Sequence, residues 1–393
     1  ALAAGAGRPT IIDIKNNLSK GIRKASDFLM GLQLTGAYKK SSLANLQVQL
    51  PAIVIGGGLT AIDTATELLA YYPVQIEKVA QRVHDLVAEK GTDAVRAMFD
   101  DEEWGELQVQ LQHAKELEEE RDRAAKEGRD PRVQPLLEKW GGVSLVYRRS
   151  VLESPAYRLN HEEVQKSLEE GVKYIENLSP TEAVLDQYGH VKAMKFRRMT
   201  GERDEVELPA RTVCVAAGTS PNTMYEKEYE GSFALDAKKQ YFQAHEAKVD
   251  GDKVVLTPSS GRNPEAFFTS YAGDGRRAVT FYGDNHPYYA GSVVKAMASA
   301  KHGFHHVSAL FPELASLSSA DQPMRDSKLA SFFESLDDAL LARVVEVNRL
   351  TKTIVEVVVK SPMAARKFQP GQFYRHRDRK STRLNSSHVS ISY

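Results

Sequence analysis

Residues 53–61 read Ile-Val-Ile-Gly-Gly-Gly-Leu-Thr-Ala, an apolar run that leads directly into three consecutive glycines. A compact apolar run of this kind is typical of a strand buried in a parallel sheet. After the glycines, apolar residues recur at helical spacing, namely Ala61, Ile62, Ala65, Leu68 and Leu69. The stretch therefore predicts a strand–turn–helix unit, and with it an α/β fold containing a Rossmann-like domain.

The glycine turn is a candidate dinucleotide site. Glycines permit a tight turn and a close approach of the backbone to a pyrophosphate, whose charge the free N–H groups of the helix N-terminus stabilise. The third glycine of the usual G-x-G-x-x-G pattern is replaced here by another small residue, alanine. The alternative is a glycine-rich turn that is packed for shape only. The candidate cofactor contacts are Gly56, Gly57, Gly58, Thr60, Ala61 and Asp63.

Two arginines follow the next predicted sheet strand, Val143–Tyr147. In a dinucleotide-binding fold this position faces the adenosine ribose, where an acidic side chain would accept a hydrogen bond from the 2′-hydroxyl. Arg148 and Arg149 instead suit a 2′-phosphate, which favours NADPH over NADH. The alternative is a basic pair that only faces solvent.

A second glycine-containing region is found further along the chain. Gly218 ends a buried apolar strand, and Gly283-Asp284 closes another strand before a helix that is expected to begin near Gly291-Ser292. An acid placed there can bind a ribityl or ribose hydroxyl, and the helix N-terminus can stabilise a phosphate or the charge of a flavin ring.

Composition narrows the class of protein. The formal net charge is zero, with 52 basic and 52 acidic side chains, which argues against a general nucleic-acid binder. Cys214 is the only cysteine, so a disulfide framework or a Cys-x-x-Cys redox pair within these residues is excluded. We also expect no metal site, no membrane span and a cytoplasmic location.

These motifs together resemble a known family. The glycine turn, Val146-Tyr147-Arg148-Arg149, Ala216–Asn222 and Gly283-Asp284 look like the small subunit of glutamate synthase and its relatives. Those proteins are FAD-dependent, NADPH-oxidising members of the pyridine nucleotide-disulfide oxidoreductase superfamily. The family's amino-terminal FAD pyrophosphate loop and cysteine-rich iron–sulfur region are missing from these residues, so we expect a fragment.

The resemblance implies a role for each motif. Gly56, Gly58 and Ala61 would hold the pyrophosphate of the nicotinamide cofactor, and Arg148 and Arg149 its 2′-phosphate. Asp284 would hold the ribityl chain of FAD, with the start of the following helix, Gly291-Ser292, over the flavin. No side-chain acid or base is required for hydride transfer, so no catalytic residue is expected.

A second resemblance concerns the C-terminal part. Residues 342–347, 354–359 and 368–374 look like the opening of a ferredoxin–NADP reductase-type flavin barrel, while residues 380–393 resemble translated adapter sequence. The expected organisation is the end of an FAD-binding domain (1–50), an NAD(P)-binding domain (51–220) with a helical insert (74–139), a return to the FAD-binding domain (221–311), a linker (312–339), a partial β-barrel (340–375) and an artefactual or disordered tail (376–393).

The leading hypothesis is thus an FAD-dependent NAD(P)H oxidoreductase that passes hydride from NADPH to flavin and electrons onward to a partner. That partner would be an electron-acceptor protein or domain, such as an iron–sulfur centre. The alternative of another class is a non-catalytic nucleotide sensor whose helical insert docks a partner.

Overall fold

The computed structural model describes residues 1–370 except 203, 317 and 367, together with residues 376–377 and 384–385. The chain divides into two compact units, Ala1–His306 and Val307–Tyr393. Residues 371–374 of the predicted segment 368–374, and most of the predicted tail 376–393, lie outside the described residues.

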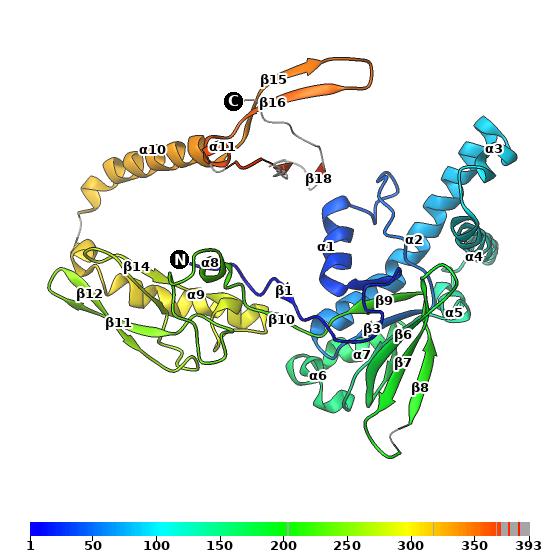
Figure 1. Ribbon diagram of the computed structural model, residues 1–393, viewed down its shortest axis with the longest axis horizontal. Helices are drawn as coiled ribbons and strands as arrows, with labels where there is room; N and C mark the ends of the chain where they lie inside the picture. The colour runs from blue at the N-terminus through cyan, green and yellow to red at the C-terminus, as the bar shows by residue number, and fades with distance from the viewer. Residues whose placement is uncertain (203, 317, 367, 371–375, 378–383, 386–393) are drawn as a thin grey trace. The chain divides into compact units, whose positions relative to one another are not determined.

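Five parallel strands form the central sheet of the first unit (Figure 1). All four strand pairings are parallel, which confirms the predicted α/β class with a parallel sheet. The strand that leads into the glycine turn, β3, is the middle strand. In spatial order the strands are β2 (Ile22–Lys24), β9 (Thr212–Val215), β3 (Ala52–Ile55), β4 (Val143–Val146) and β5 (Lys173–Ile175).

The middle strand is buried on both faces because its side chains alternate between two cores. Ala52 and Val54 pack into a core shared with α1 (Ala25–Thr35) and α2 (Leu59–Lys90). Ile53 and Ile55 pack into a second core on the opposite face. This explains why the sequence here is a continuous apolar run rather than an alternating one.

A three-stranded antiparallel sheet provides that second core. It contains β6 (Leu178–Leu185), β7 (Val191–Arg198) and β8 (Glu205–Pro209). β6 and β7 pair antiparallel and form a hairpin around Tyr188-Gly189. Between β4 and β5 the chain forms η1 (Val151–Glu153), α6 (Pro155–Leu159) and α7 (His161–Glu169).

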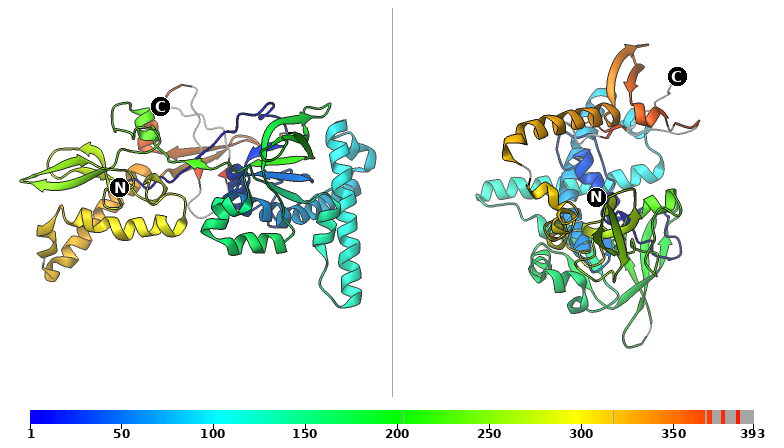
Figure 2. Two further views of the ribbon diagram at one scale, coloured as in Figure 1. Left: turned by 90° about the horizontal axis from the view of Figure 1, so that it is seen from below. Right: turned by 90° about the vertical axis from the view of Figure 1, so that its left-hand side faces the viewer.

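The helical insert is an extension of the dinucleotide unit's own helix. α2 continues without a break through Pro73 to Lys90, so the insert has no structural boundary near residue 74. Helix α4 begins with a capping box formed by Asp100 and Glu103 and packs against α2 (Figure 2). Besides this end of α2, the insert contains three helices, α3 (Thr92–Arg96), α4 (Asp101–Glu127) and α5 (Val133–Lys139).

Residues on both sides of the central-sheet segment form another part of the first unit. Leu2 pairs in parallel with Phe281, next to a four-stranded antiparallel sheet. Helix α9 (Val293–Ser308) approaches this region closely at Gly303, where a methyl group would overlap Tyr282 and Phe267. The sheet, in spatial order, contains β12 (Lys253–Pro258), β11 (His245–Asp250), β13 (Phe268–Ala272) and β14 (Ala278–Thr280).

Two short strands that pair with each other connect the central-sheet segment to this other part of the first unit. β1 (Arg8–Pro9) pairs antiparallel with β10 (Thr219–Ser220), and the N–H of Thr10 donates to the carbonyl of Gly218 at 2.9 Å. The chain therefore enters and leaves the central-sheet segment at the same place.

The second unit contains α10 (Gln322–Leu340), α11 (Pro362–Arg366) and the hairpin of β15 (Arg343–Arg349) and β16 (Val355–Lys360). The β-rich segments expected from about residue 340 are confirmed as strands. Residues 322–340, expected within a linker, form a helix because Leu329, Phe332 and Phe333 recur at helical spacing after a proline in its first turn.

Candidate functional site

The glycine turn lies where β3 ends and α2 begins, and its glycines are required for two different packing reasons. A methyl group at Gly56 would overlap the carbonyl oxygen of Ala216, at the end of the neighbouring strand β9. A methyl group at Gly57 would overlap the ring of Tyr147, which follows β4. At Gly58 a methyl group would meet no atom within 4 Å, so the turn is open on that side.

The open side of the turn is the N-terminus of α2. Gly58 is the N-cap residue and has no side chain with which to cap the helix. The first turn contains no acidic residue, and Thr60 is exposed there. A helix end of this kind presents backbone N–H groups and the positive end of the helix dipole to an approaching anion. Ala61 is fully buried and allows α2 to pack tightly beneath the turn.

Asp63 is the last of the candidate contacts named for this motif, and it lies further along α2 than the others. It lies on the second turn, because the helix begins at Leu59. Partial burial and the nearby carboxylate of Glu163 on α7 raise the pKa of Asp63.

The two arginines lie at the same edge of the sheet as the glycine turn. β4 is parallel to β3 and adjacent to it, so the carboxyl ends of both strands meet at this edge. A backbone hydrogen bond also joins the chain after β4 to the glycine turn, because the N–H of Ala156 donates to the carbonyl of Gly57 at 3.0 Å. Arg148 and Arg149 are exposed, and neither guanidinium has an ion pair with any residue that the structure describes.

The loop that carries the arginines is held by the end of β5. The N–H of Asn177 donates to the carbonyl of Arg149 at 3.3 Å. Glu176 accepts from the Ser150 hydroxyl at 3.1 Å and from the backbone N–H of Val151. The sequence analysis missed Glu176, because an acid after a short strand carries no signal until the strand order is known.

Gly218 lies at the junction of the two connecting strands. It has a φ of 95°, a conformation that favours glycine, and its carbonyl accepts from Thr10. Its role in the structure is to turn the chain from β9 into β10, close to Ala216 and hence to Gly56.

The structure also brings together the residues of the second glycine region. Residues 283–285 form a 3-10 turn, η2 (Gly283–Asn285), instead of the strand end that was expected. Asp284 accepts from the N–H of Gly291 at 2.9 Å, and Ser292 accepts the first backbone hydrogen bond of α9 from Ala296. Gly283 donates to the hydroxyl of Ser299 on α9 at 2.9 Å.

Asn285 is a further residue of this region that sequence reasoning missed. Its side chain is fully buried, and its Nδ2 donates to the carbonyl of Asn222 at 2.9 Å. Its Oδ1 has no partner among the described residues. Next to it, burial lowers the pKa of His286 to about 4, so this imidazole is neutral at pH 7. Neither role could be read from the sequence, because both depend on burial.

Three further features were considered among the described residues, namely metal-ligating side chains, the cysteine and membrane-spanning helices. No group of three or more His, Cys, Asp or Glu side chains there is arranged to hold a metal ion. Cys214 is fully buried in β9, which raises the pKa of its thiol to about 12 and makes it a core residue. No described helix combines the length and the hydropathy that crossing a bilayer requires.

Comparison with known sequences identifies a relative that is itself uncharacterized. No family model matches the chain. An uncharacterized protein of Rickettsia prowazekii (strain Madrid E) is 32% identical over 375 residues, which cover 95% of this chain and 45% of that protein. The chain thus spans less than half the length of this relative.

Comparison with solved structures returns thioredoxin reductases and an oxidoreductase in complex with NADPH. Thioredoxin reductase of T. acidophilum has 14% identity and a TM-score of 0.35, over 67% of this chain and 52% of that one. Thioredoxin reductase of Lactococcus lactis has 11% identity and a TM-score of 0.41, over 79% and 65%. FprA of Mycobacterium tuberculosis in complex with NADPH has 14% identity and a TM-score of 0.42, over 82% and 67%.

Proposed function

We propose that this chain binds NADPH at the carboxyl edge of its parallel sheet, as part of an FAD-dependent oxidoreductase. The observation that carries the proposal is the uncapped N-terminus of α2 behind Gly58, on the same sheet edge as two arginines without an ion pair. Phosphate groups are the chemistry that both features recognise.

The glycine turn fits a pyrophosphate. The space beside Gly58 would be filled by any side chain at that position, and the helix N-terminus has no acidic residue in its first turn to repel an anion. Backbone N–H groups at the start of α2 would hold the pyrophosphate oxygens, with Thr60 beside them. Gly56 and Gly57 would act indirectly, because they let β3 approach β9 and Tyr147.

Arg148 and Arg149 fit the 2′-phosphate that distinguishes NADPH from NADH. A guanidinium group forms charge-assisted hydrogen bonds with phosphate oxygens, and these two groups are free to do so. Glu176 is close to the same loop, but it is bound by Ser150 and Val151 and forms no ion pair with either arginine.

The region around Asp284 is the proposed flavin side. Asp284 orders the start of α9 through Gly291, and the N-terminus of α9 would face the flavin. The unpartnered Oδ1 of Asn285 shows that this region has an acceptor left to satisfy. Within this class we favour a protein like the small subunit of glutamate synthase, with a C-terminal module of the ferredoxin reductase type.

The chain itself would bind and orient the cofactors. When both are bound, the nicotinamide supplies hydride and the flavin accepts it. The turn, the arginines and Asp284 would fix the distance and orientation on which this transfer depends. No residue is assigned a proton-transfer role. Electrons would then pass to an acceptor protein or domain, for which we propose an iron–sulfur centre.

The NADPH assignment is tested by replacing both arginines with alanine. We expect Arg148→Ala/Arg149→Ala to weaken NADPH binding by about tenfold or more, because a charge-assisted hydrogen bond contributes about 1.5–3 kcal/mol. NADH binding should change little. Isothermal titration calorimetry with each nucleotide measures the ratio, and Arg197→Ala, an exposed arginine on β7, is the control. An unchanged NADPH/NADH ratio contradicts the assignment.

A second experiment separates the oxidoreductase from a nucleotide sensor. The protein is incubated with FAD, freed of unbound flavin and mixed with NADPH under anaerobic conditions. Retention of flavin and loss of its visible absorption support the oxidoreductase. A colourless protein that still binds NADPH supports the sensor.

A further inference from the structure

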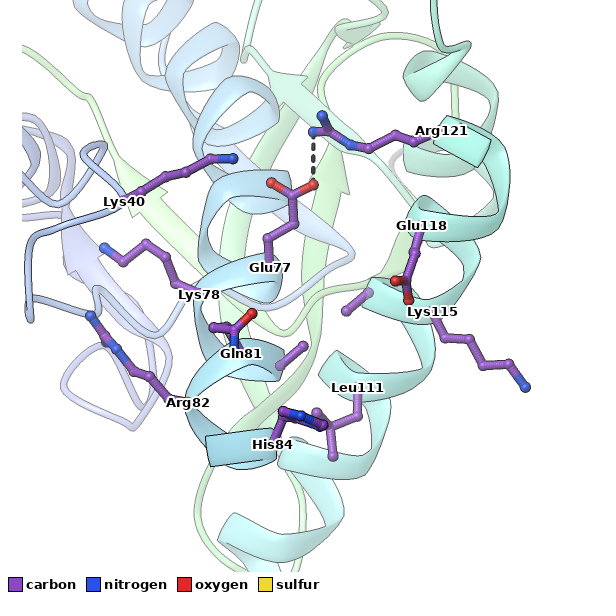
Figure 3. A pocket seen from close by; sticks show the side chains of 12 residues that line it. Lys40, Glu77, Lys78, Gln81, Arg82, His84, Leu111, Lys115, Glu118 and Arg121 are labelled. Carbon is purple, nitrogen blue, oxygen red and sulfur yellow. Dashed lines mark ion pairs between the residues drawn. The ribbon is translucent and has the colours of Figure 1, made fainter. Parts of the chain in front are cut away.

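A cavity lies far from the glycine turn, between helices α2 and α4 and the loop of residues 36–46 (Figure 3). Its volume is about 710 Å³, within the range of sites that bind small organic molecules. Lys78 lies on its α2 side, about 30 Å along the helix axis from Gly58 by the rise of an α-helix. The cavity is therefore separate from the proposed dinucleotide site.

Lys78 is an unusual residue for such a place. Its side chain is only 6% exposed, and its ammonium group donates to the carbonyl oxygens of Ala37 at 2.7 Å and Ala44 at 3.0 Å. Both acceptors are neutral, and an ammonium group has three protons, so one donor remains. Burial and the nearby positive charge of Arg82 lower the pKa of Lys78. A buried cation without a counter-ion is costly.

Two further cations lie on the same wall (Figure 3). Arg82 donates through its terminal nitrogens to the carbonyls of Ser42 at 2.6 Å and Leu43 at 3.3 Å. Lys40 is exposed. In the part of the chain that the structure describes, none of Lys40, Lys78 and Arg82 forms an ion pair. The wall is thus positively charged and lacks an anion.

The opposite wall is different in character. Arg121 on α4 is already paired with Glu77 of α2 at 2.8 Å. Leu111 contributes apolar surface, and Glu118 of α4 lines the cavity opposite the cations (Figure 3). This carboxylate disfavours a ligand that is negatively charged throughout. It permits a ligand with one anionic end and an uncharged or cationic remainder.

We propose that this cavity binds a small organic molecule through a terminal phosphate or carboxylate group, held by Lys40 and stabilised by the positive charges of Lys78 and Arg82. The ammonium of Lys40 would donate to the anionic oxygens, and Leu111 would contact the rest of the molecule. The carbonyls that hold Lys78 and Arg82 also fix the loop of residues 36–46, so the site exists before the ligand arrives.

Inorganic phosphate and acetate are the probes, titrated separately into the full chain at low ionic strength by calorimetry. We expect saturable binding of at least one of them, and which one binds identifies the anionic group. Lys40→Gln should weaken it about fivefold or more without changing the thermal unfolding temperature, because Lys40 has no partner to lose. Glu118→Gln should strengthen it severalfold by removing an opposing charge.

Lys126→Gln is the matched control, because Lys126 is an exposed lysine of α4 that does not line the cavity. Its affinity should equal that of the unchanged protein. Two results overturn the proposal. One is that neither probe binds saturably. The other is that Lys40→Gln binds phosphate or acetate as tightly as the unchanged protein, as it would if the anion bound only at the N-terminus of α2.

Discussion

Single residues of the glycine turn have separate tasks that the sequence pattern does not distinguish. Gly56 is required by the neighbouring strand, since any side chain there overlaps Ala216, whereas Gly58 leaves open space at the start of α2. The motif could be recognised from the sequence because strand, glycines and helix are contiguous. The contacts with Ala216 and Tyr147 could not, because they join segments far apart in the chain.

This difference predicts that two alanine substitutions affect different properties of the protein, stability in one case and NADPH binding in the other. Gly56→Ala should lower the free energy of unfolding by about 1–3 kcal/mol, the usual cost of overpacking a buried site. Gly58→Ala should cost less than about 1 kcal/mol, yet weaken NADPH binding, because the new methyl group occupies the space beside the helix N-terminus. Urea denaturation and nucleotide titration measure the two effects. Equal losses of stability would contradict this division of tasks.

His286 predicts a pH dependence of stability. Its imidazole donates from Nε2 to the carbonyl of Ala266 at 3.2 Å and accepts from the N–H of Tyr288 at 3.2 Å, so it must be neutral in the folded state. Its pKa is lowered from 6.5 to about 4. The unfolded chain binds a proton in this interval and the folded chain does not, so stability is complete above pH 6.5 and decreases as the pH falls toward 4.

The matched variant is His286→Phe, which keeps a ring next to Phe281 but cannot titrate. It should be less stable than the unchanged protein at pH 7, because Ala266 and Tyr288 lose a partner. The difference should shrink between pH 6.5 and about 4. Chemical denaturation across this interval measures it, and a constant difference would assign the pH dependence to other groups.

At the scale of elements, the loop after β4 is positioned by the end of β5. Ser150, Val151 and Arg149 are all hydrogen-bonded to Glu176 or Asn177. The strand before the arginines was predicted from the sequence, and the arginines follow its end as expected. We call these hydrogen bonds to Glu176 and Asn177 the clamp. The clamp forms only because β4 and β5 are neighbours, and the order of the strands is decided by the whole sheet.

We therefore expect Glu176→Ala to weaken NADPH binding severalfold more than NADH binding, because the loop that orients the arginines loses two hydrogen bonds. Glu176→Gln should retain most of the selectivity, since its amide oxygen still accepts from Val151. Glu153→Ala, an exposed acid in the same loop, is the control. A parallel loss for both nucleotides in Glu176→Ala would show that the clamp serves stability and not selectivity.

The helical insert shows a limit of pattern recognition at the same scale. The change to a charged sequence near residue 74 was interpreted as a boundary, although α2 continues through it. Charge patterning reports exposure, and the buried side chains of α2 continue to Lys78, beyond the point at which the sequence becomes charged. A helix that passes from core to solvent therefore looks like two segments in the sequence.

At the scale of the whole molecule, the two units differ in how they are stabilised. The described residues of the first unit form clusters of buried apolar side chains on both faces of the central sheet and around Phe242 and Phe281. From residue 311 onward, no described apolar side chain is fully buried, and Val344, Val345 and Val347 of β15 are exposed. A two-stranded hairpin of this kind is marginally stable by itself.

A chain that ends at residue 320 should therefore unfold at the same temperature as the full chain and bind NADPH equally well. Differential scanning calorimetry and nucleotide titration check this. Limited proteolysis of the full chain should also cut first after residue 310 and leave the first unit intact. A large loss of stability on truncation would show that the second unit supports the first.

The paired connecting strands have a consequence for how this fold can be rebuilt. Thr10 and Gly218 are joined by a hydrogen bond, so everything between them begins and ends at a single point. Such a segment can be excised as a cassette, because a short linker suffices to reconnect Pro9 with Thr219. The same geometry allows a nucleotide-binding cassette from another protein to be transplanted between these two residues without lengthening either connection.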